Sequence, residues 1–167
     1  MITQKQMDDK FIQGNIKGLL LQEVLEGIQS ITTRQKKIQA LQANESPLLM
    51  FTLKTILDKN IQMTITPTKA KETIKKYRAK ATYMDPSMAP ASIKSRIKTI
   101  RRFIQTDPFV LNEAQTEDQI ISFVNLFTQE DTDIMQAMFT KKMPYKSITI
   151  ALVNKAFPDL IPVEETK

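Results

Sequence analysis

Hydrophobic residues recur at helical spacing along almost the whole chain, and the alternation of apolar and polar residues that is typical of strands is nearly absent. Apolar positions at steps of three and four predict helices over about residues 3–30, 33–43, 47–59, 67–82, 91–105, 116–127, 131–142 and 146–157. Residues 61–65 do alternate, and we interpret them as a connector, with a short strand as the alternative. The pattern therefore predicts an all-α fold.

Residues that cap helices mark several of these starts. Ser46-Pro47 and Thr66-Pro67 each combine a hydroxyl at the N-cap with proline at the first helical position. The sequence Thr-Glu-Asp-Gln at 116–119 has the spacing of a capping box, in which the N-cap and a side chain three residues later satisfy each other's backbone groups. We therefore expect helices to begin at these three places.

The predicted first helix contains all three glycines of the chain. Each glycine costs a helix about 1 kcal/mol relative to alanine. Gly14 and Gly18 are one turn apart on the same face, which indicates close approach of a neighbouring helix. A kink or break near Asn15 is the alternative.

Turn-forming residues followed by Pro108 end the helix predicted over 91–105, and we place a lobe boundary there. The prediction is a two-lobe helical protein, with an N-terminal helical lobe at 1–106 that carries a basic helical pair. A small three-helix C-terminal lobe follows at 107–167. We expect the tail from Pro158 to be frayed.

The 167-residue chain is long enough to bury a core, yet it has no His, no Cys and no Trp. These absences exclude Ser-His-Asp and Cys-His catalysis, zinc fingers and disulfides. Close carboxylate pairs lie at predicted helix starts or on polar faces, where capping and solvation explain them: Asp8 with Asp9, Glu23 with Glu26, Glu117 with Asp118, and Asp131 with Asp133. We predict a noncatalytic protein with no cofactor and no metal site.

The N-terminal residues lack the basic and apolar regions of a signal peptide. The longest apolar runs are far shorter than the roughly 20 residues that a membrane-spanning helix needs. These features predict a soluble cytoplasmic protein with no membrane partner.

Charge is strongly segregated along the chain. Between residues 69 and 102 there are eleven basic and two acidic residues, a net charge of +9 within a total of +6. Residues 107–133 follow with seven acids and no base. A polyanion would bind the basic segment favourably, because each phosphate neutralised by Lys or Arg releases condensed counterions.

Helical spacing places many of these cations on shared faces, and we predict that they contact nucleic-acid phosphates. The predicted binding residues are Lys69, Lys76, Arg78, Lys80, Lys94, Lys98, Arg101 and Arg102. Tyr77 and Tyr83 lie in the same stretch, where they could stack on bases. The alternatives are a solvated helix surface, pairing with the acidic segment across the lobes, and an acidic protein partner.

Two local patterns are similar to DNA-binding helices. Residues 91–103 look like a helix of the core-binding domain of tyrosine recombinases, although recombination is excluded by the absence of His and of a catalytic lobe. Residues 145–157 have the pattern of a recognition helix in a helix-turn-helix. A packed terminal helix is the alternative for that second segment.

Three stretches resemble the YqeY family, which is similar to the tail domain of the aspartyl/glutamyl-tRNA amidotransferase B subunit. They are residues 46–57, the helix start at 116–121, and the segments 133–138, Met143-Pro144 and 152–155. The resemblance covers about residues 35–157. The glycines that the family has around its Met-Pro segment are missing here, where Gln136 and Phe139 stand nearby.

This resemblance implies a helical lobe, a connector and a small three-helix lobe, without catalysis, and a role in contacting the body of a tRNA. Together with the basic segment it predicts a nucleic-acid-binding accessory protein, with structured RNA and tRNA favoured. The alternative is a protein-interaction module that regulates or inhibits a larger complex through its N-terminal helix. The first 32 residues have no counterpart in the family.

Overall fold

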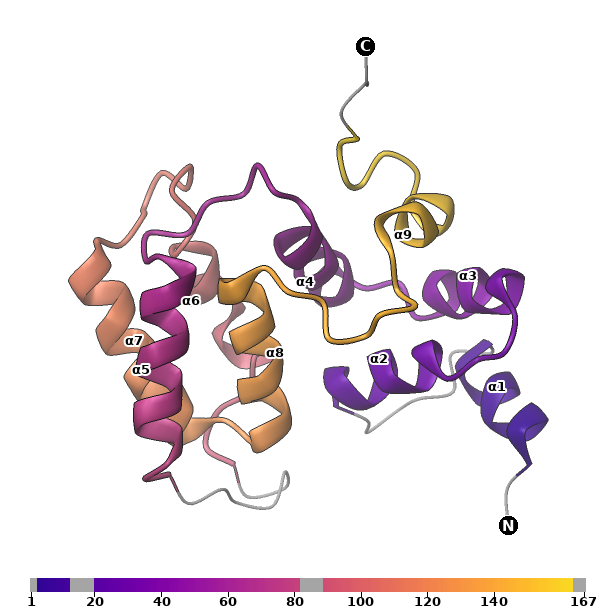
Figure 1. Ribbon diagram of the computed structural model, residues 1–167, viewed down its shortest axis with the longest axis horizontal. Coiled ribbons are helices and arrows are strands. Elements are labelled where there is room, and N and C mark those ends of the chain that lie inside the picture. The colour runs from indigo at the N-terminus through magenta and orange to yellow at the C-terminus, as the bar shows by residue number, and fades with distance from the viewer. Residues whose placement is uncertain (1–2, 13–19, 82–88, 164–167) are drawn as a thin grey trace. The chain divides into compact units, whose positions relative to one another are not determined.

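All regular structure in the computed structural model is helical, within the residues that it describes, 3–12, 20–81 and 89–163. This confirms the predicted all-α fold (Figure 1). The helices are α1 (Gln4–Ile12), α2 (Leu21–Gln29), α3 (Arg34–Ala43), α4 (Pro47–Leu57), α5 (Pro67–Arg78), the 3₁₀ helix η1 (Lys94–Arg96), α6 (Ile97–Arg101), α7 (Glu113–Leu126), α8 (Gln129–Thr140) and α9 (Ile150–Ala156).

The chain forms two compact units, which differ from the two predicted lobes. Unit 1 comprises Met1–Asp58 and Met143–Lys167, and unit 2 is the continuous segment Lys59–Lys142. Unit 2 is thus inserted into unit 1. The expected boundary between residues 106 and 107 falls inside unit 2, because α5 packs against α7 and α8 from the other side of that boundary.

Unit 1 combines the N-terminal and the C-terminal segments of the chain. Helix α3 contacts α1, α2 and α9, and its Gln42 side chain donates to the Ala156 carbonyl of α9 at 3.3 Å. The fully buried residues include Leu25, Ile28, Leu41 and Leu53. Because α9 follows the inserted unit, unit 1 is complete only when the chain returns from unit 2.

Unit 2 is organised around α5, α7 and α8. Phe103, which follows α6, is fully buried, and its ring centroid lies 6.1 Å from that of Phe123 and 5.5 Å from that of Phe139. Phe123 in turn stacks on Phe127 at 4.8 Å. This aromatic cluster joins the α6 segment to α7 and α8.

The single helix predicted over residues 3–30 is wrong. Two separate helices, α1 and α2, occupy its ends, and residues 13–19, with Gly14, Asn15 and Gly18, lie outside the described residues. Leu20, the N-cap of α2, has extended backbone with φ −74° and ψ 155°, so the chain does not continue into α2 as one helix. The apolar side chains Val24, Leu25 and Ile28 of α2 are buried.

The α-helix predicted over 91–105 is shorter at both ends. The 3₁₀ helix η1 precedes α6, and the chain leaves the α-helix after Arg101. The Thr64 amide donates to the Phe103 carbonyl, and the Gln105 amide donates to the Gln62 carbonyl, each at 2.8 Å. These bonds make an isolated bridge between Met63 and Ile104. Residues 61–65 are therefore a connector that pairs at one point, and no strand forms in the part of the chain described.

The capping box predicted at 116–119 is also wrong, and the N-cap of α7 lies four residues earlier than predicted. Asn112 is the N-cap, its side chain accepts from the Gln115 amide, and the Gln115 side chain accepts from the Asn112 amide. Thr116 is instead buried inside α7, where its hydroxyl is 2.6 Å from the Thr64 hydroxyl. Asparagine caps a helix as well as threonine does, so the actual box was equally available in the sequence.

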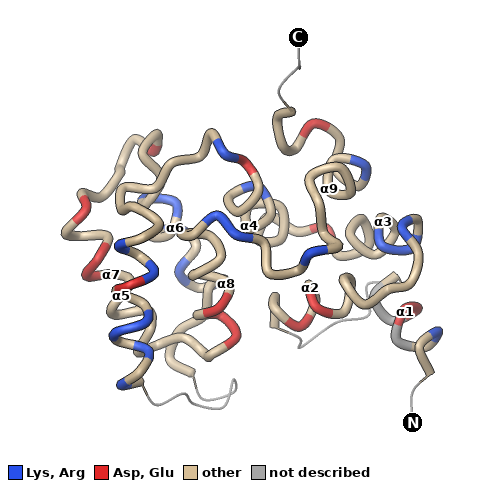
Figure 2. Tube along the Cα trace, in the orientation of Figure 1, with Lys and Arg blue, Asp and Glu red and all other residues tan. Residues whose placement is uncertain are grey.

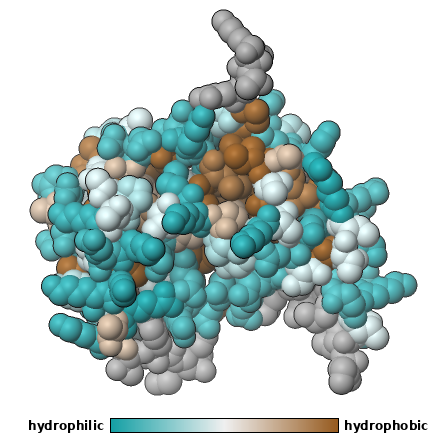
Figure 3. Space-filling model, in the orientation of Figure 1, coloured by the Kyte–Doolittle hydropathy of each residue, from teal (hydrophilic) through white to brown (hydrophobic). Residues whose placement is uncertain are grey.

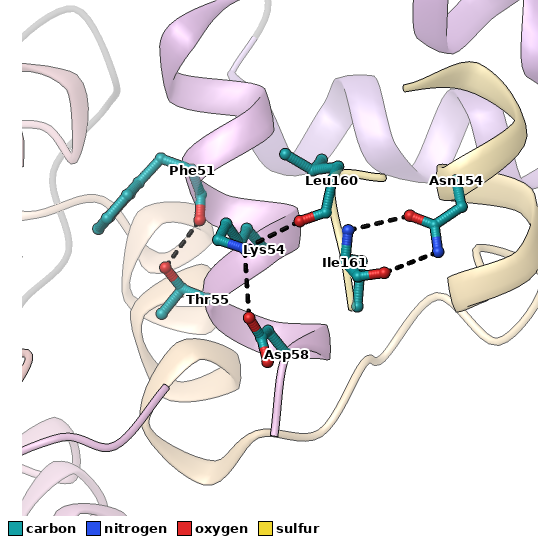
Figure 4. Close-up of polar contacts among 7 residues, drawn as sticks. All are labelled: Phe51, Lys54, Thr55, Asp58, Asn154, Leu160 and Ile161. Atoms are coloured by element: carbon teal, nitrogen blue, oxygen red, sulfur yellow. Dashed lines mark hydrogen bonds and ion pairs between the residues drawn. The ribbon is translucent and has the colours of Figure 1, made fainter. Parts of the chain in front are cut away.

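The C-terminal segment is held more firmly than its predicted fraying implies (Figure 4). The Asn154 amide group donates to the Ile161 carbonyl and accepts from the Ile161 amide, both at 2.9 Å. Lys54 of α4 donates to the Leu160 carbonyl at 2.9 Å and pairs with Asp58 at 3.2 Å. Residues 160 and 161 are therefore tied to α4 and α9.

Replacing Asn154 by alanine is expected to free this segment while unit 1 remains folded. Loss of two hydrogen bonds, each worth about 1 kcal/mol, speeds local opening about tenfold or more. Amide hydrogen exchange at Ile161 measures this opening, with the exposed neighbour variant Lys155→Ala as the control. Unchanged protection of Ile161 in Asn154→Ala would show that the two bonds do not hold the segment.

Candidate nucleic-acid interface

Unit 2 carries most of the excess positive charge. Its segment has 14 Lys and Arg residues against 9 Asp and Glu residues, so it contributes +5 of the total of +6. Basic residues run along α5 and recur on α6 (Figure 2), and η1 adds Lys94 and Arg96. An interface for a polyanion is therefore to be sought on this unit.

Two basic residues of α5 lie against acidic residues of neighbouring helices. Lys69 Nζ is 2.5 Å from Glu113 and 3.4 Å from Glu117 of α7. The hydrogen bond to Glu113 is the main reason that the pKa of the Lys69 ammonium group is raised. On the other flank, Arg78 Nη2 is 2.5 Å from Asp133 Oδ1 of α8. Both cations therefore already have carboxylate partners.

The outward face of α5 is different. Ala70, Thr73 and Ile74 are buried on the side that meets α7 and α8, so the opposite side faces outward. That outward face exposes Lys71, Lys75 and Lys76, and hydrophilic residues cover most of the surface over α5 in Figure 3. We call these three residues the α5 lysine face.

Lys80 lies just beyond the C-terminus of α5 and is also exposed. Only one acidic residue, Glu72, lies within the helix itself. The α5 lysine face with Lys80 is therefore a strip of four cations with little opposing charge on its own element.

The second basic region is η1 with α6 and Arg102. Its basic residues are exposed: Lys94, Arg96, Lys98, Arg101 and Arg102. Arg102 also has a structural contact, because its Nε donates to the Phe109 carbonyl at 2.8 Å. The main packing partners of α5 are α7 and α8 rather than α6, so the two basic segments do not form the expected helical pair.

The eight residues predicted to contact phosphates thus fall into two groups in the structure. Lys69 and Arg78 pair with acidic side chains, as in the alternative in which the basic segment pairs with the acidic one. That pairing was expected across two lobes, and here it lies within unit 2. The remaining six are exposed, namely Lys76, Lys80, Lys94, Lys98, Arg101 and Arg102. Sequence reasoning left out Lys71 and Lys75, which a helical projection centred on buried Ala70 and Ile74 would have placed outward.

The structure offers little support for the prediction that two tyrosines stack on bases. Tyr77 is half-buried, and Lys76 Nζ lies 5.5 Å from the centroid of its ring. Tyr83 lies outside the described residues. Tyr77 therefore contributes to the packing of α5 and to the placement of Lys76.

Three acidic residues of α7 and α8 make structural contacts. Buried Asp131 accepts from the Ile93 amide at 3.2 Å, while Asp133 binds Arg78 and Glu117 binds Lys69. Desolvation raises the pKa of the Asp131 carboxyl, and the hydrogen bond from Ile93 partly opposes this effect. Asp131 thereby fixes the start of the η1 segment to α8.

Two variants of Asp131 separate its charge from its hydrogen bond. Asp131→Ala leaves the Ile93 amide unpaired, which is expected to lower the free energy of unfolding by about 1–3 kcal/mol. Asp131→Asn keeps an acceptor and is expected to cost about 1 kcal/mol or less at neutral pH.

The raised pKa gives this site a pH dependence. The folded carboxyl binds its proton more tightly than the unfolded one, whose ordinary pKa is 3.8. The wild type should therefore gain stability relative to Asp131→Asn as the pH falls from neutral to about 4. Urea unfolding across this range measures the difference, and the opposite trend would contradict the assignment.

Each of the two segments that are similar to DNA-binding helices buries apolar side chains within its own unit. Ile93, Ile100 and Phe103 of the first are buried in unit 2. In the second, α9 contacts α3, and Leu152 and Val153 are buried. The packed terminal helix is thus the better interpretation of residues 145–157.

Other kinds of site have little support among residues 3–12, 20–81 and 89–163. No group of three or more Asp and Glu side chains there is placed to hold a metal ion. No helix in that part of the chain is long and apolar enough to cross a bilayer. A hollow of about 510 Å³ in unit 2 has Lys59, Lys141 and Glu113 among its lining residues, a mixture that specifies no ligand.

Comparisons of the chain with protein-family models, with curated proteins and with solved structures found no match.

Proposed function

We propose that this chain is a noncatalytic nucleic-acid-binding accessory protein, and that its ligand is structured RNA, with tRNA favoured. The observation that carries the proposal is the sorting of charge around α5. Its flanking cations are paired with acids, whereas the α5 lysine face and Lys80 remain exposed. Within the part of the chain that the structure describes, no carboxylate pairs with these four lysines, so phosphates would meet this surface without first breaking an ion pair there.

The chemistry of the surface favours backbone recognition. Lysine binds phosphate as a compact point charge and carries no base-reading geometry. Helical RNA is recognised mainly by shape, phosphates and 2′-hydroxyls, so a strip of lysines suits it. The resemblance to the YqeY family and to the amidotransferase tail domain points to tRNA, and it stays a prediction.

Binding to bulk tRNA, and to duplex DNA of equal length, across a salt series tests this proposal. Four lysine–phosphate contacts give a slope of log K against log salt of about −3 to −4. We expect tRNA to bind more tightly than DNA with a slope of this size. Absence of tRNA binding at low salt, or tighter binding to DNA, would overturn the proposal.

The alternative hypothesis of a protein-interaction module rested on a long amphipathic N-terminal helix and on the opposed acidic and basic segments. The apolar side chains Val24, Leu25 and Ile28 of α2 are buried in unit 1, so this described part of the segment supports the alternative less. We therefore place the binding surface on unit 2.

A further inference from the structure

The loop between α6 and α7 exposes an aromatic side chain. Phe109 is 74% exposed and Val110 is 40% exposed, whereas Leu111 next to them is buried. A phenylalanine left in water forgoes about 1.5–3 kcal/mol of burial energy. Single exposed apolar residues are common, so exposure alone assigns no role.

Hydrogen bonds fix the backbone on both sides of this ring. The Phe109 amide donates to Asp107 Oδ1, and the Phe109 carbonyl accepts from Arg102 Nε, each at 2.8 Å. The Leu111 amide donates to the Arg102 carbonyl at 2.8 Å. The loop is thus built to hold Phe109 outward, and binding through this ring costs little backbone entropy.

The segment that precedes this loop is basic. Arg102 contacts its carbonyl directly, and exposed Arg101 and Lys98 precede Arg102 on α6. The one acidic residue in the loop, Asp107, accepts the Phe109 amide. An aromatic face beside exposed cations suits a nucleobase with its adjoining phosphates.

A protein partner suits this feature less well. A specific protein interface buries about 800 Å² on each side and has an apolar centre. The exposed large apolar side chains at this loop are only Phe109 and Val110, and their neighbours on α6 are charged. One ring matches the size of one base.

We propose that Phe109 is a stacking platform for an unpaired base of the bound RNA, with Lys98 and Arg101 contacting the adjoining phosphates. This inference rests on the proposed RNA-binding function. It adds a preference for RNA that combines a helical stem with unpaired nucleotides.

The test compares two RNA probes with the full chain and three variants. One probe is a blunt RNA duplex, and the other is a hairpin with the same stem closed by an unpaired loop that contains 2-aminopurine. The variants are Phe109→Ala, Phe109→Leu and Phe109→Tyr. Because Phe109 is 74% exposed, none of them removes a core side chain.

We expect the wild type to prefer the hairpin and to quench the 2-aminopurine. Phe109→Ala should lower hairpin affinity about 5- to 100-fold, as loss of one stacked base does, and leave duplex affinity unchanged. Phe109→Tyr should retain the preference, and Phe109→Leu should lose the quenching.

Failure of the proposed RNA binding and failure of base stacking by Phe109 give different results. If the wild type binds neither probe, the proposed function fails and this inference with it. If the wild type binds both probes but Phe109→Ala keeps the hairpin preference, only this inference is overturned. A leucine variant that matches the wild type in affinity and quenching would also overturn stacking.

Discussion

Reversing the charge of the α5 lysine face, in the variant Lys71→Glu/Lys75→Glu/Lys76→Glu, is expected to weaken tRNA binding about 100-fold or more at moderate salt. Each substitution removes one lysine–phosphate interaction and adds a repulsive charge at the same place. The slope of log K against log salt should flatten by about 3, because three fewer phosphates are neutralised by the variant. Fluorescence anisotropy with labelled tRNA measures both quantities.

A matched control separates a local effect from one of net charge. Arg34→Glu/Lys36→Glu/Lys37→Glu reverses three charges on α3 of unit 1 and gives the same formal net charge of zero. This variant should retain most of the affinity. Equal losses in the two variants would mean that overall charge, and not α5, governs binding.

The stability of the α5 variant needs a check of its own. Lys75 and Lys76 are in the last turn of α5, where cations interact favourably with the helix dipole. Their reversal is expected to cost about 1–2 kcal/mol of stability. Circular dichroism at the binding temperature should therefore show that the α5 variant remains folded before its affinity is interpreted.

Replacing Phe103 by alanine is expected to have the largest effect on folding, a loss of about 3–5 kcal/mol in the stability of unit 2. The ring is fully buried and packs between Phe123 and Phe139, so its removal leaves a cavity where α6, α7 and α8 meet. A loss of this size is a large fraction of the about 5–15 kcal/mol that holds a domain folded.

Urea unfolding followed by circular dichroism measures this loss. Phe109→Ala is the matched control, because the same substitution is made a few residues away at a side chain that is 74% exposed. It should change the stability by less than about 0.5 kcal/mol. Similar losses for both variants would show that Phe103 is not at the centre of the core.

Local features of the fold were predictable where local chemistry decides them. The Ser46 and Thr66 side chains accept from the amides of Leu49 and Lys69 at the helix starts that the sequence predicted. Helix α3 likewise begins after the N-cap Thr33. These starts depend on residues within one turn, so no tertiary information was needed.

Features that depend on tertiary neighbours were not predictable in this way. Apolar periodicity shows which face of a helix is buried, but it does not show which helices meet. For that reason the expected boundary at 106 and 107 separated α5 from α7 and α8, on which it packs. The helix over 91–105 was likewise overestimated, because the backbone bonds that end it come from residues 62–64.

In the candidate site, too, some features follow from local sequence and others depend on tertiary neighbours. The total positive charge of the basic segment was evident from composition, whereas the ion pairs of Lys69 and Arg78 required knowledge of where Glu113 and Asp133 lie. Once those two cations are set aside, the exposed residues of α5 follow from its buried face. Lys71 and Lys75 then enter the candidate interface.

Lysine footprinting shows whether RNA contacts the α5 lysine face. The full chain is treated with an amine-acetylating reagent, with and without tRNA at low salt, and modification is quantified by mass spectrometry. We expect tRNA to slow acetylation of Lys71, Lys75 and Lys76 several-fold and to leave acetylation of Lys155 in unit 1 unchanged. Equal protection at Lys155, or none on α5 while tRNA is bound, would contradict this expectation.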